Sequence, residues 1–383
     1  MDGAARRVLE SFQTCFADVA DPRVAASCDH QLMDILVITV LAVLSGADDW
    51  TDIETFGKLR QEWLKAFLEL PNGIPSHDTF SRVLGLLDPG ELTTGLFQWT
   101  RALQEATGGK LIAIDGKSLR RSFRKKSGWD QLHLVTAWAS DNGLTLGQVA
   151  CADKSNEITA IPQLLKLLNL EGCTVTIDAM GCQTEIAAQI RDRKAHYLLA
   201  LKGNQSGLQA DMQHLFEHGA ATNFSGMKHA VHQTTETGHG RTDERACHVV
   251  EIPPDHPQRN RWRDLRTLVV TVSRRVVNDQ EHWESRLYIS SHPPRARQLA
   301  EAVRKHWGIE NGQHWVLDVT FGEDARRQQH RTGATNLAAV RRLAVSLLRQ
   351  DTTLKRGAKC KRMACALDSN YLLRILHNAK FDA

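Results

Sequence analysis

The sequence lacks paired cysteines, long apolar runs and a strong excess of charge of either sign. Its eight cysteines are scattered singly, without CxxC pairs, which argues against a zinc knuckle and against a disulfide framework. The most apolar run, 35–44, is far shorter than the ~20 residues that a membrane-spanning helix needs. No apolar signal-peptide segment follows Arg6 and Arg7. These absences predict a cytoplasmic protein with reduced thiols.

The charge balance is nearly even. The 48 Lys and Arg residues stand against 44 Asp and Glu residues, so the formal charge of the 383-residue chain is only +4. This charge permits a polyanionic partner but does not by itself indicate one. The length allows two or three domains, at roughly 150 residues per domain.

Residues 1–108 have the apolar spacing of helices and are expected to form a helical N-terminal domain. Within it, Ser76 is placed to cap a helix over 77–87, after a turn rich in Gly and Pro. A helix, a turn and a second helix are found both in DNA-reading helix-turn-helix motifs and in plain helical bundles. DNA binding by this domain is therefore one of two open interpretations.

The pattern changes after Gly109, and residues 109–350 are expected to form an α/β domain. Apolar runs at 111–114, 132–139, 144–152, 174–177 and 197–201 predict strands, and 158–168 and the residues around 186–190 predict helices. Asp141-Asn142-Gly143 is a strong hairpin signal between two of these strands. The alternation indicates a mixed sheet with helices packed on it.

A mostly β insertion is predicted at about 203–291, followed by helices from Ala296 to Leu348 and a basic tail over 351–383. The tail is interpreted as a phosphate-binding arm or a disordered end. Trp262 and Trp283 lie in the insertion, where they either belong to the core or stack on a nucleic-acid base; we favour the core for both.

Two aspartates stand where apolar strands are expected to end. Asp115 follows Ile114, and Asp178 follows Ile177. Two carboxylates at one sheet edge repel each other unless a cation lies between them, and hard oxygen ligands suit Mg²⁺ or Mn²⁺. Glu310 is the candidate third acid, with Asp318 as an alternative. Helical spacing places Trp307, Glu310, His314 and Asp318 on one face.

Basic and polar groups near these acids are candidate phosphate contacts, with a solvated loop as the alternative interpretation. Three of them follow the first aspartate, at the start of a basic run that continues to Lys126. Two follow the fifth strand, and two lie in a glycine-flanked loop of the insertion. In that order they are Lys117, Arg120 and Arg121, then Lys202 and Asn204, then His239 and Arg241.

Longer phrases of the sequence resemble the DDE transposases of bacterial insertion sequences, in particular the ISAs-type branch with the H-repeat-associated proteins. The matching phrases run along nearly the whole chain. They are Asp21-Pro22-Arg23, Ala47-Asp48-Asp49-Trp50, 73–80 (GIPSHDTF), Ile114-Asp115-Gly116-Lys117, 178–183 (DAMGCQ), 201–205 (LKGNQ), Gly238-His239-Gly240-Arg241 and 306–311 (HWGIEN).

The resemblance implies an RNase H-like catalytic core in which Asp115, Asp178 and Glu310 hold two Mg²⁺ or Mn²⁺ ions. It further implies metal-dependent cleavage of double-stranded DNA at the terminal inverted repeats of the element, strand transfer into target DNA, a homodimer on DNA and association with the nucleoid. Two alternatives remain open. One is an inactive DNA-binding relic or regulator, and the other is a metal-dependent nuclease that does not join strands.

The chain departs from the broader transposase group around the glutamate. That group carries a Tyr, Arg, Glu, Lys signature, whereas this chain has Val303, His306 and Leu317 at the three positions other than Glu310. Arg304, His306 and His314 are therefore expected to contact DNA, with Lys305 as a further basic neighbour.

Overall fold

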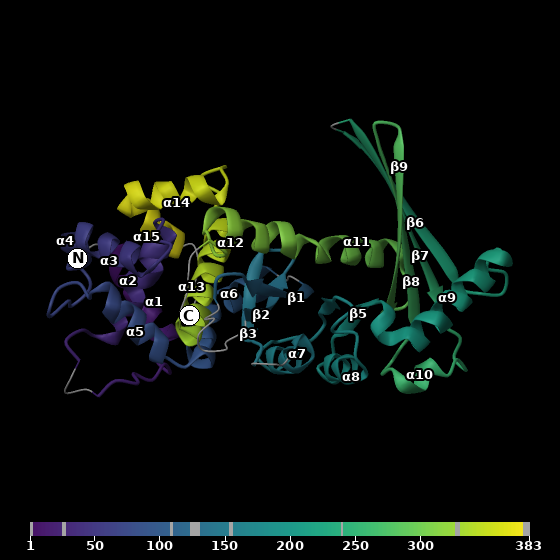
Figure 1. Ribbon diagram of the computed structural model, residues 1–383, viewed down its shortest axis with the longest axis horizontal. Helices are drawn as coiled ribbons and strands as arrows, with labels where there is room; N and C mark the ends of the chain where they lie inside the picture. Colours follow the sequence, from purple (N-terminus) through teal and green to yellow (C-terminus); the bar gives the residue numbers. More distant parts are fainter. Residues whose placement is uncertain are drawn as a thin grey trace. The chain divides into compact units, whose positions relative to one another are not determined.

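The computed structural model describes residues 3–24, 28–107, 110–122, 131–152, 156–238, 240–325 and 330–377. The chain divides into two compact units (Figure 1). Unit 1 comprises 1–109, 116–156 and 309–383, and unit 2 comprises 110–115 and 157–308. Within the described ranges, no helix combines the length and apolar character needed to cross a membrane.

Unit 1 is mainly helical and is organised around one long helix, α13. Its helices are α1 (Gly3–Cys15), α2 (Leu32–Leu44), α3 (Trp50–Leu59), α4 (Gln61–Leu64), α5 (His77–Leu86), α6 (Pro89–Thr107), α12 (Trp315–Thr320), α13 (Arg331–Gln350), α14 (Ala358–Leu367) and α15 (Ser369–His377). Helix α13 is buried almost throughout and packs against α2, α5 and α6. Residues from the two ends of the sequence therefore share one core.

Helix α5 is fixed at both ends. The Ser76 hydroxyl accepts a hydrogen bond from the Thr79 N–H at 3.3 Å, which confirms the predicted N-cap. At the other end, the buried Asn336 amide of α13 donates to the carbonyls of Leu84 (2.7 Å) and Leu87 (3.1 Å). These bonds satisfy helix-end carbonyls that would otherwise lack a partner. The setting of α5 is that of a helix in a bundle.

The predicted hairpin is present in unit 1. Strands β2 (Leu132–Ala139) and β3 (Leu144–Ala150) pair antiparallel, with Ala139 opposite Leu144. Gly143 in the turn has a φ of 68°, a conformation that glycine adopts without strain. Leu119, at the end of β1 (Leu111–Leu119), packs with hairpin residues and α13 in a buried cluster.

Unit 2 carries most of the sheet. Its strands are β4 (Thr174–Ile177), β5 (His196–Leu201), β6 (His229–Gly238), β7 (Arg241–Glu251), β8 (Thr267–Val277) and β9 (Gln280–Ser290), together with the first half of β1. Strands β1, β4 and β5 are parallel, whereas β9, β8, β7 and β6 follow with antiparallel pairing. Over the described residues, nine strands hydrogen-bond in the order β3-β2-β1-β4-β5-β9-β8-β7-β6, which confirms the predicted mixed sheet.

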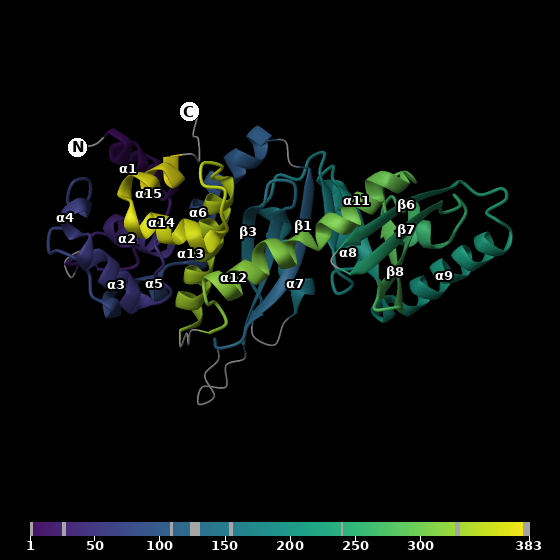
Figure 2. The same ribbon diagram turned by 90° about the horizontal axis from the view of Figure 1, so that it is seen from above.

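The helices of unit 2 are α7 (Glu157–Lys166), α8 (Thr184–Asp192), α9 (Ser206–Ala221), α10 (Gln258–Arg261) and α11 (Ala296–His306). Helix α11 contacts β4, β5, β6 and β7, and Figure 2 shows it lying over these strands. Its buried residues Leu299 and Val303 join Val249 and Val269 in the core of the unit.

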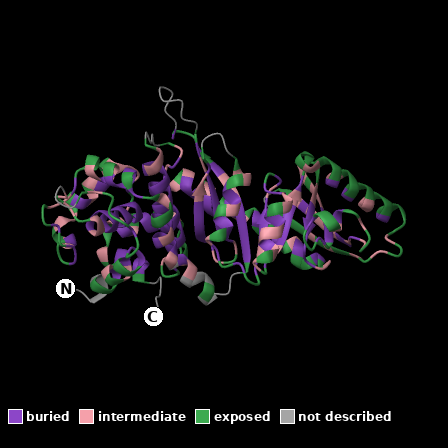
Figure 3. Ribbon diagram, turned by 90° about the horizontal axis from the view of Figure 1, so that it is seen from below, coloured by how far each residue is buried: buried purple, intermediate pink, exposed green. Residues whose placement is uncertain are grey.

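Two sequence-based expectations need correction, and the predicted, mostly β insertion also contains a helix. Helix α9 lies inside the predicted β insertion; its helical pattern is weak because few of its side chains are buried (Figure 3). Trp262 is a core residue, as predicted, but Trp283 on β9 is 65% exposed. The described part of the basic tail forms α14 and α15 rather than an arm. In this segment the side chain of Lys361 is buried, and its ammonium group donates a hydrogen bond to the Leu348 carbonyl (2.8 Å).

Candidate active site

The register of two parallel strands brings Asp115 and Asp178 together. Ile114 of β1 pairs with Ile177 of β4, so the aspartates that follow them are neighbours across strands that lie about 4.8 Å apart. The sequence predicts that the strand ends at Asp115, but in the structure the strand continues beyond it. Strand β1 continues to Leu119 because Lys117 and Leu119 both find buried positions.

Asp178 is a half-buried carboxylate in an acidic setting. Its Oδ1 accepts a hydrogen bond from the Met180 N–H at 3.1 Å. Burial raises the pKa of Asp178, and the nearby charge of Glu157 raises it further, while the Gly181 and Met180 amides and Lys202 act in the opposite direction. A group whose ionised form is disfavoured in this way would be stabilised by a bound cation.

The loops that follow β4 and β5 are tied to each other. The Asn204 side chain donates to the Ala179 carbonyl at 2.5 Å, and the Gln205 side chain donates to the Cys182 carbonyl at 3.0 Å. These bonds fix the loop that begins at Asp178. Asn204, predicted to contact DNA, therefore has a structural role in holding this loop.

Glu310 is exposed and opens a short π-helical turn, Glu310–His314, between α11 and α12. π-Helical turns are rare in proteins, and those that occur often lie at functional sites. The turn interrupts the regular α-helical spacing from which the common face of Trp307, Glu310, His314 and Asp318 was predicted. His314 is largely buried in unit 1; burial, followed by the charges of Arg342 and Lys117, lowers its pKa to about 3.

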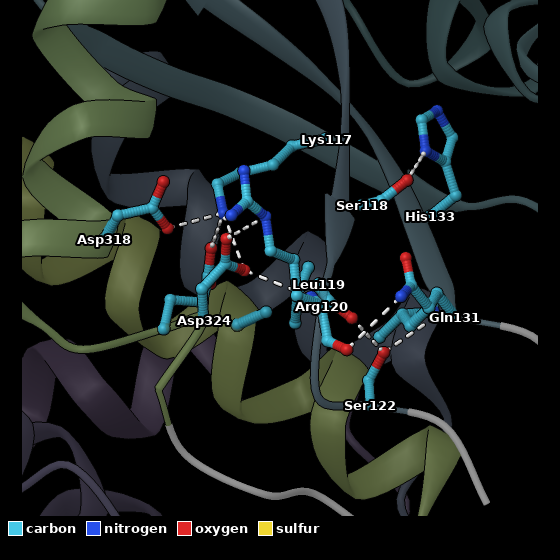
Figure 4. Close-up of polar contacts among 12 residues, drawn as sticks. Lys117, Ser118, Leu119, Arg120, Ser122, Gln131, His133, Asp318 and Asp324 are labelled. Atoms are coloured by element: carbon cyan, nitrogen blue, oxygen red, sulfur yellow. Dashed lines mark hydrogen bonds and ion pairs between the residues drawn. The ribbon is translucent and has the colours of Figure 1, made fainter. Parts of the chain in front are cut away.

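Lys117 lies in an acidic cluster of unit 1 that sequence reasoning missed (Figure 4). Its Nζ lies 2.7 Å from Asp318 Oδ1, 3.3 Å from Asp324 Oδ1 and 3.5 Å from Glu323 Oε2. The side chain is only 8% exposed. The predicted phosphate contact by Lys117 is therefore corrected to an internal ion pair, and Asp318, the alternative third ligand, is occupied by the same ammonium group.

His306 also faces inward. It is buried at the end of α11, where its Nδ1 lies 2.9 Å from the Thr176 hydroxyl of β4. Burial lowers its pKa to about 4, so the ring is neutral near pH 7. A buried neutral imidazole does not reach DNA, and the predicted contact by His306 is corrected to packing of α11 on β4.

Five basic residues among the predicted DNA contacts are exposed, and four of these contact polar partners. Arg120 Nε lies 3.4 Å from Asp324, Arg121 donates to the Ala325 carbonyl, Arg241 Nε lies 3.2 Å from Asp243, and Arg304 Nη1 lies 2.5 Å from Glu236. Lys202, the fifth, follows β5 and is exposed. His239, and the end of the basic run at 124–126, lie outside the described residues.

Asp115 and Asp178 are candidate ligands for a metal ion. Among the described residues, no group of three or more His, Cys, Asp or Glu side chains is arranged to hold a metal ion. Asp115 and Asp178 nonetheless fit a divalent cation, because they are oxygen donors on adjacent strands and Asp178 is destabilised as an anion.

Comparisons with known proteins assign the family. Residues 106–347 match the transposase DDE domain, and residues 13–100 match the associated N-terminal family, DDE_Tnp_1-associated. The chain belongs to the DDE transposase family, whose domain implies an RNase H-like fold and thereby confirms the predicted fold class.

Two relatives in Escherichia coli match nearly the whole chain, and a third matches a short part of it. "Putative transposase YncI" of strain O157:H7 is 41% identical over 96% of this chain and 95% of its own. "H repeat-associated putative transposase YhhI" of strain K12 is 36% identical over 94% and 95%. "Inactive transposase YbfQ" of strain K12 is 48% identical, but over only 17% of this chain and 76% of its own.

Proposed function

We propose that the protein cleaves double-stranded DNA at the ends of an insertion sequence and transfers the freed ends into target DNA. Asp115, Asp178 and Glu310 are proposed to hold two Mg²⁺ or Mn²⁺ ions. The observation that carries the proposal is the in-register pairing of β1 with β4, which sets Asp115 beside Asp178 in a chain that belongs to the DDE transposase family. The exposed position of Glu310 in a π-helical turn gives further support.

Asp115, Asp178 and Glu310 would hold the divalent ions, which would supply activation of the attacking water or 3′-hydroxyl and stabilisation of the leaving oxygen. The chain's own residues orient the ligands. The Met180 amide holds the Asp178 carboxylate, and Asn204 and Gln205 hold the loop around it. Fixed ligands matter because a displacement of about 1 Å in the reacting groups can cost about a hundredfold in rate.

DNA phosphates are proposed to bind the exposed basic groups rather than the buried ones. Arg120, Arg121, Lys202, Arg241 and Arg304 are the described members of this set, and His239 remains a further candidate. Because each phosphate contact releases counterions, binding should weaken as salt rises. A homodimer on DNA is proposed as the assembly that holds two element ends at once.

The test uses labelled DNA from the flanks of the reading frame, with and without Mg²⁺. Wild type is compared with Asp115→Asn, Asp178→Asn and Glu310→Gln. Glu62→Gln is the control, because Glu62 is an exposed acid that forms a surface ion pair with Lys65. We expect metal-dependent nicking and joining in wild type and in the control, and neither reaction in the three variants.

Other outcomes of this experiment would support a different function or a different third ligand. End binding without cleavage by wild type would favour an inactive DNA-binding relic or regulator. Cleavage without joining would favour a nuclease. Activity that survives Glu310→Gln would move the third ligand to another acid.

A further inference from the structure

We propose that Lys117 is a positioning residue that fastens the strand carrying Asp115 to the helical segment that follows Glu310. The proposal rests on the proposed function, because it assigns Lys117 to the geometry of the same catalytic acids. It concerns contacts inside unit 1, which contains Lys117 and its three acidic partners.

Strand geometry links Lys117 to Asp115. Both lie on β1, two residues apart, so their side chains project on the same side of the strand. The backbone between them is a single Gly116, and a displacement of Lys117 is therefore passed directly to Asp115.

The ammonium group of Lys117 faces three carboxylates. Its Nζ donates hydrogen bonds to Asp318 Oδ1 and Asp324 Oδ1, and it forms an ion pair with Glu323 Oε2 at 3.5 Å. Asp318 lies in α12, which continues directly from the π-helical turn that Glu310 opens. The contact thus joins the strand of one proposed ligand to the segment of another.

The partners are themselves held in place. Glu323 is fully buried and pairs with Arg342 of α13 at 2.8 Å. Asp324 Oδ1 also accepts the backbone N–H of Arg120 at 3.2 Å, one residue beyond the end of β1. Figure 4 shows Asp318 and Asp324 converging on the Lys117 side chain. A rigid base of this kind is what a positioning contact requires.

The decisive comparison is between Lys117→Met and a matched control, Lys361→Met. Lys361 is equally buried, at 8% side-chain exposure, and also pairs with an acid, Asp351 at 3.6 Å. Both variants remove one buried ammonium group from unit 1, but only Lys117 lies on the strand of Asp115. Lys117→Arg keeps the charge and is the rescue variant.

Three quantities are measured: the single-turnover cleavage rate of end DNA, the Kd for that DNA without metal, and amide hydrogen exchange over residues 116–119 and 315–320 in the metal-free protein. For Lys117→Met we expect a rate loss of about a hundredfold, an unchanged Kd, and faster exchange in both segments. Lys361→Met should keep the rate and the exchange of these segments, and Lys117→Arg should regain much of the rate.

Stability is separated from positioning by Lys117→Met combined with Asp318→Asn. The double variant also removes the negative charge of Asp318, which Lys117→Met leaves without its ammonium partner. Its melting temperature should therefore exceed that of Lys117→Met, while its cleavage rate stays low.

The proposal is overturned if hydrogen exchange over 116–119 is unchanged in Lys117→Met, or if Lys361→Met loses as much of the cleavage rate. It is also overturned if the Kd of Lys117→Met for DNA rises together with the rate loss, because that result would indicate a phosphate contact by Lys117. If wild type does not cleave DNA, the proposed function fails and the catalytic role of Lys117 fails with it. Hydrogen exchange then still decides whether the contact holds the strand. Full activity of Lys117→Met beside an inactive Asp115→Asn would refute this inference alone.

Discussion

Acidification should destabilise unit 2 through His306. The folded pKa of this histidine is about 4, against an ordinary value of 6.5, because the ring is buried. On acidification the unfolded chain therefore takes up the proton first. The contribution of the neutral ring to stability is complete above about pH 6.5 and is lost as the pH falls toward 4.

The size of this effect follows from the two pKa values. At about pH 5 the linkage relation gives a loss of about 2 kcal/mol relative to neutral pH. For a unit of this size, that loss lowers the melting temperature by about 4–8 °C. His306→Gln removes the titrating group, so its unfolding free energy should fall by about 2 kcal/mol less than that of wild type over the same pH change.

The assay is urea unfolding of the metal-free protein at about pH 7.5 and at about pH 5. Comparing wild type with His306→Gln cancels the contributions of the other histidines. Thr176→Val is the control, because it removes the hydroxyl that contacts His306 but keeps the imidazole, and its pH dependence should remain. If wild type and His306→Gln lose the same unfolding free energy between the two pH values, His306 is not the cause of the acid sensitivity.

Further predictions concern stability, measured by chemical denaturation near pH 7. Trp283→Ala should change the unfolding free energy by less than about 0.5 kcal/mol, whereas Trp262→Ala should cost about 3–5 kcal/mol, because only Trp262 is buried. Glu323→Gln should cost about 3–5 kcal/mol by leaving Arg342 buried beside a neutral partner, and Glu323→Leu with Arg342→Met should recover part of that loss. Asn336→Ala should cost about 1–3 kcal/mol, because two carbonyls at the end of α5 lose their donor. Equal effects in the two tryptophan variants, or additive effects at Glu323 and Arg342, would contradict these expectations.

Much of the α/β core could be predicted because its signals are local. The hairpin turn at Asp141-Asn142-Gly143, the apolar strand runs and the Ser76 cap each depend on a few neighbouring residues. The pairing of Asp115 with Asp178 could be anticipated as well, since the carboxyl ends of parallel strands meet at one edge of a sheet.

What could not be predicted depends on distant partners or on faces with little burial. In the sequence, Lys117 belongs to a basic run. Its partners Asp318 and Asp324 lie 201 and 207 residues further along the chain. Helix α9 buries too few side chains to give a clear period. The π-helical turn at Glu310 adds a residue to the helical repeat, which spacing arguments based on 3.6 residues per turn do not anticipate.

The shared core of α2 and α13 has a consequence for biosynthesis. Residues 35–44 of α2 are buried, and α13 is one of the elements that cover them. At about 5–20 residues per second, a ribosome needs about 15 s to a minute to proceed from the end of α2 to the start of α13. During that interval the most apolar stretch of the chain has emerged without its final cover, so the nascent chain should depend on chaperones until its last quarter is made.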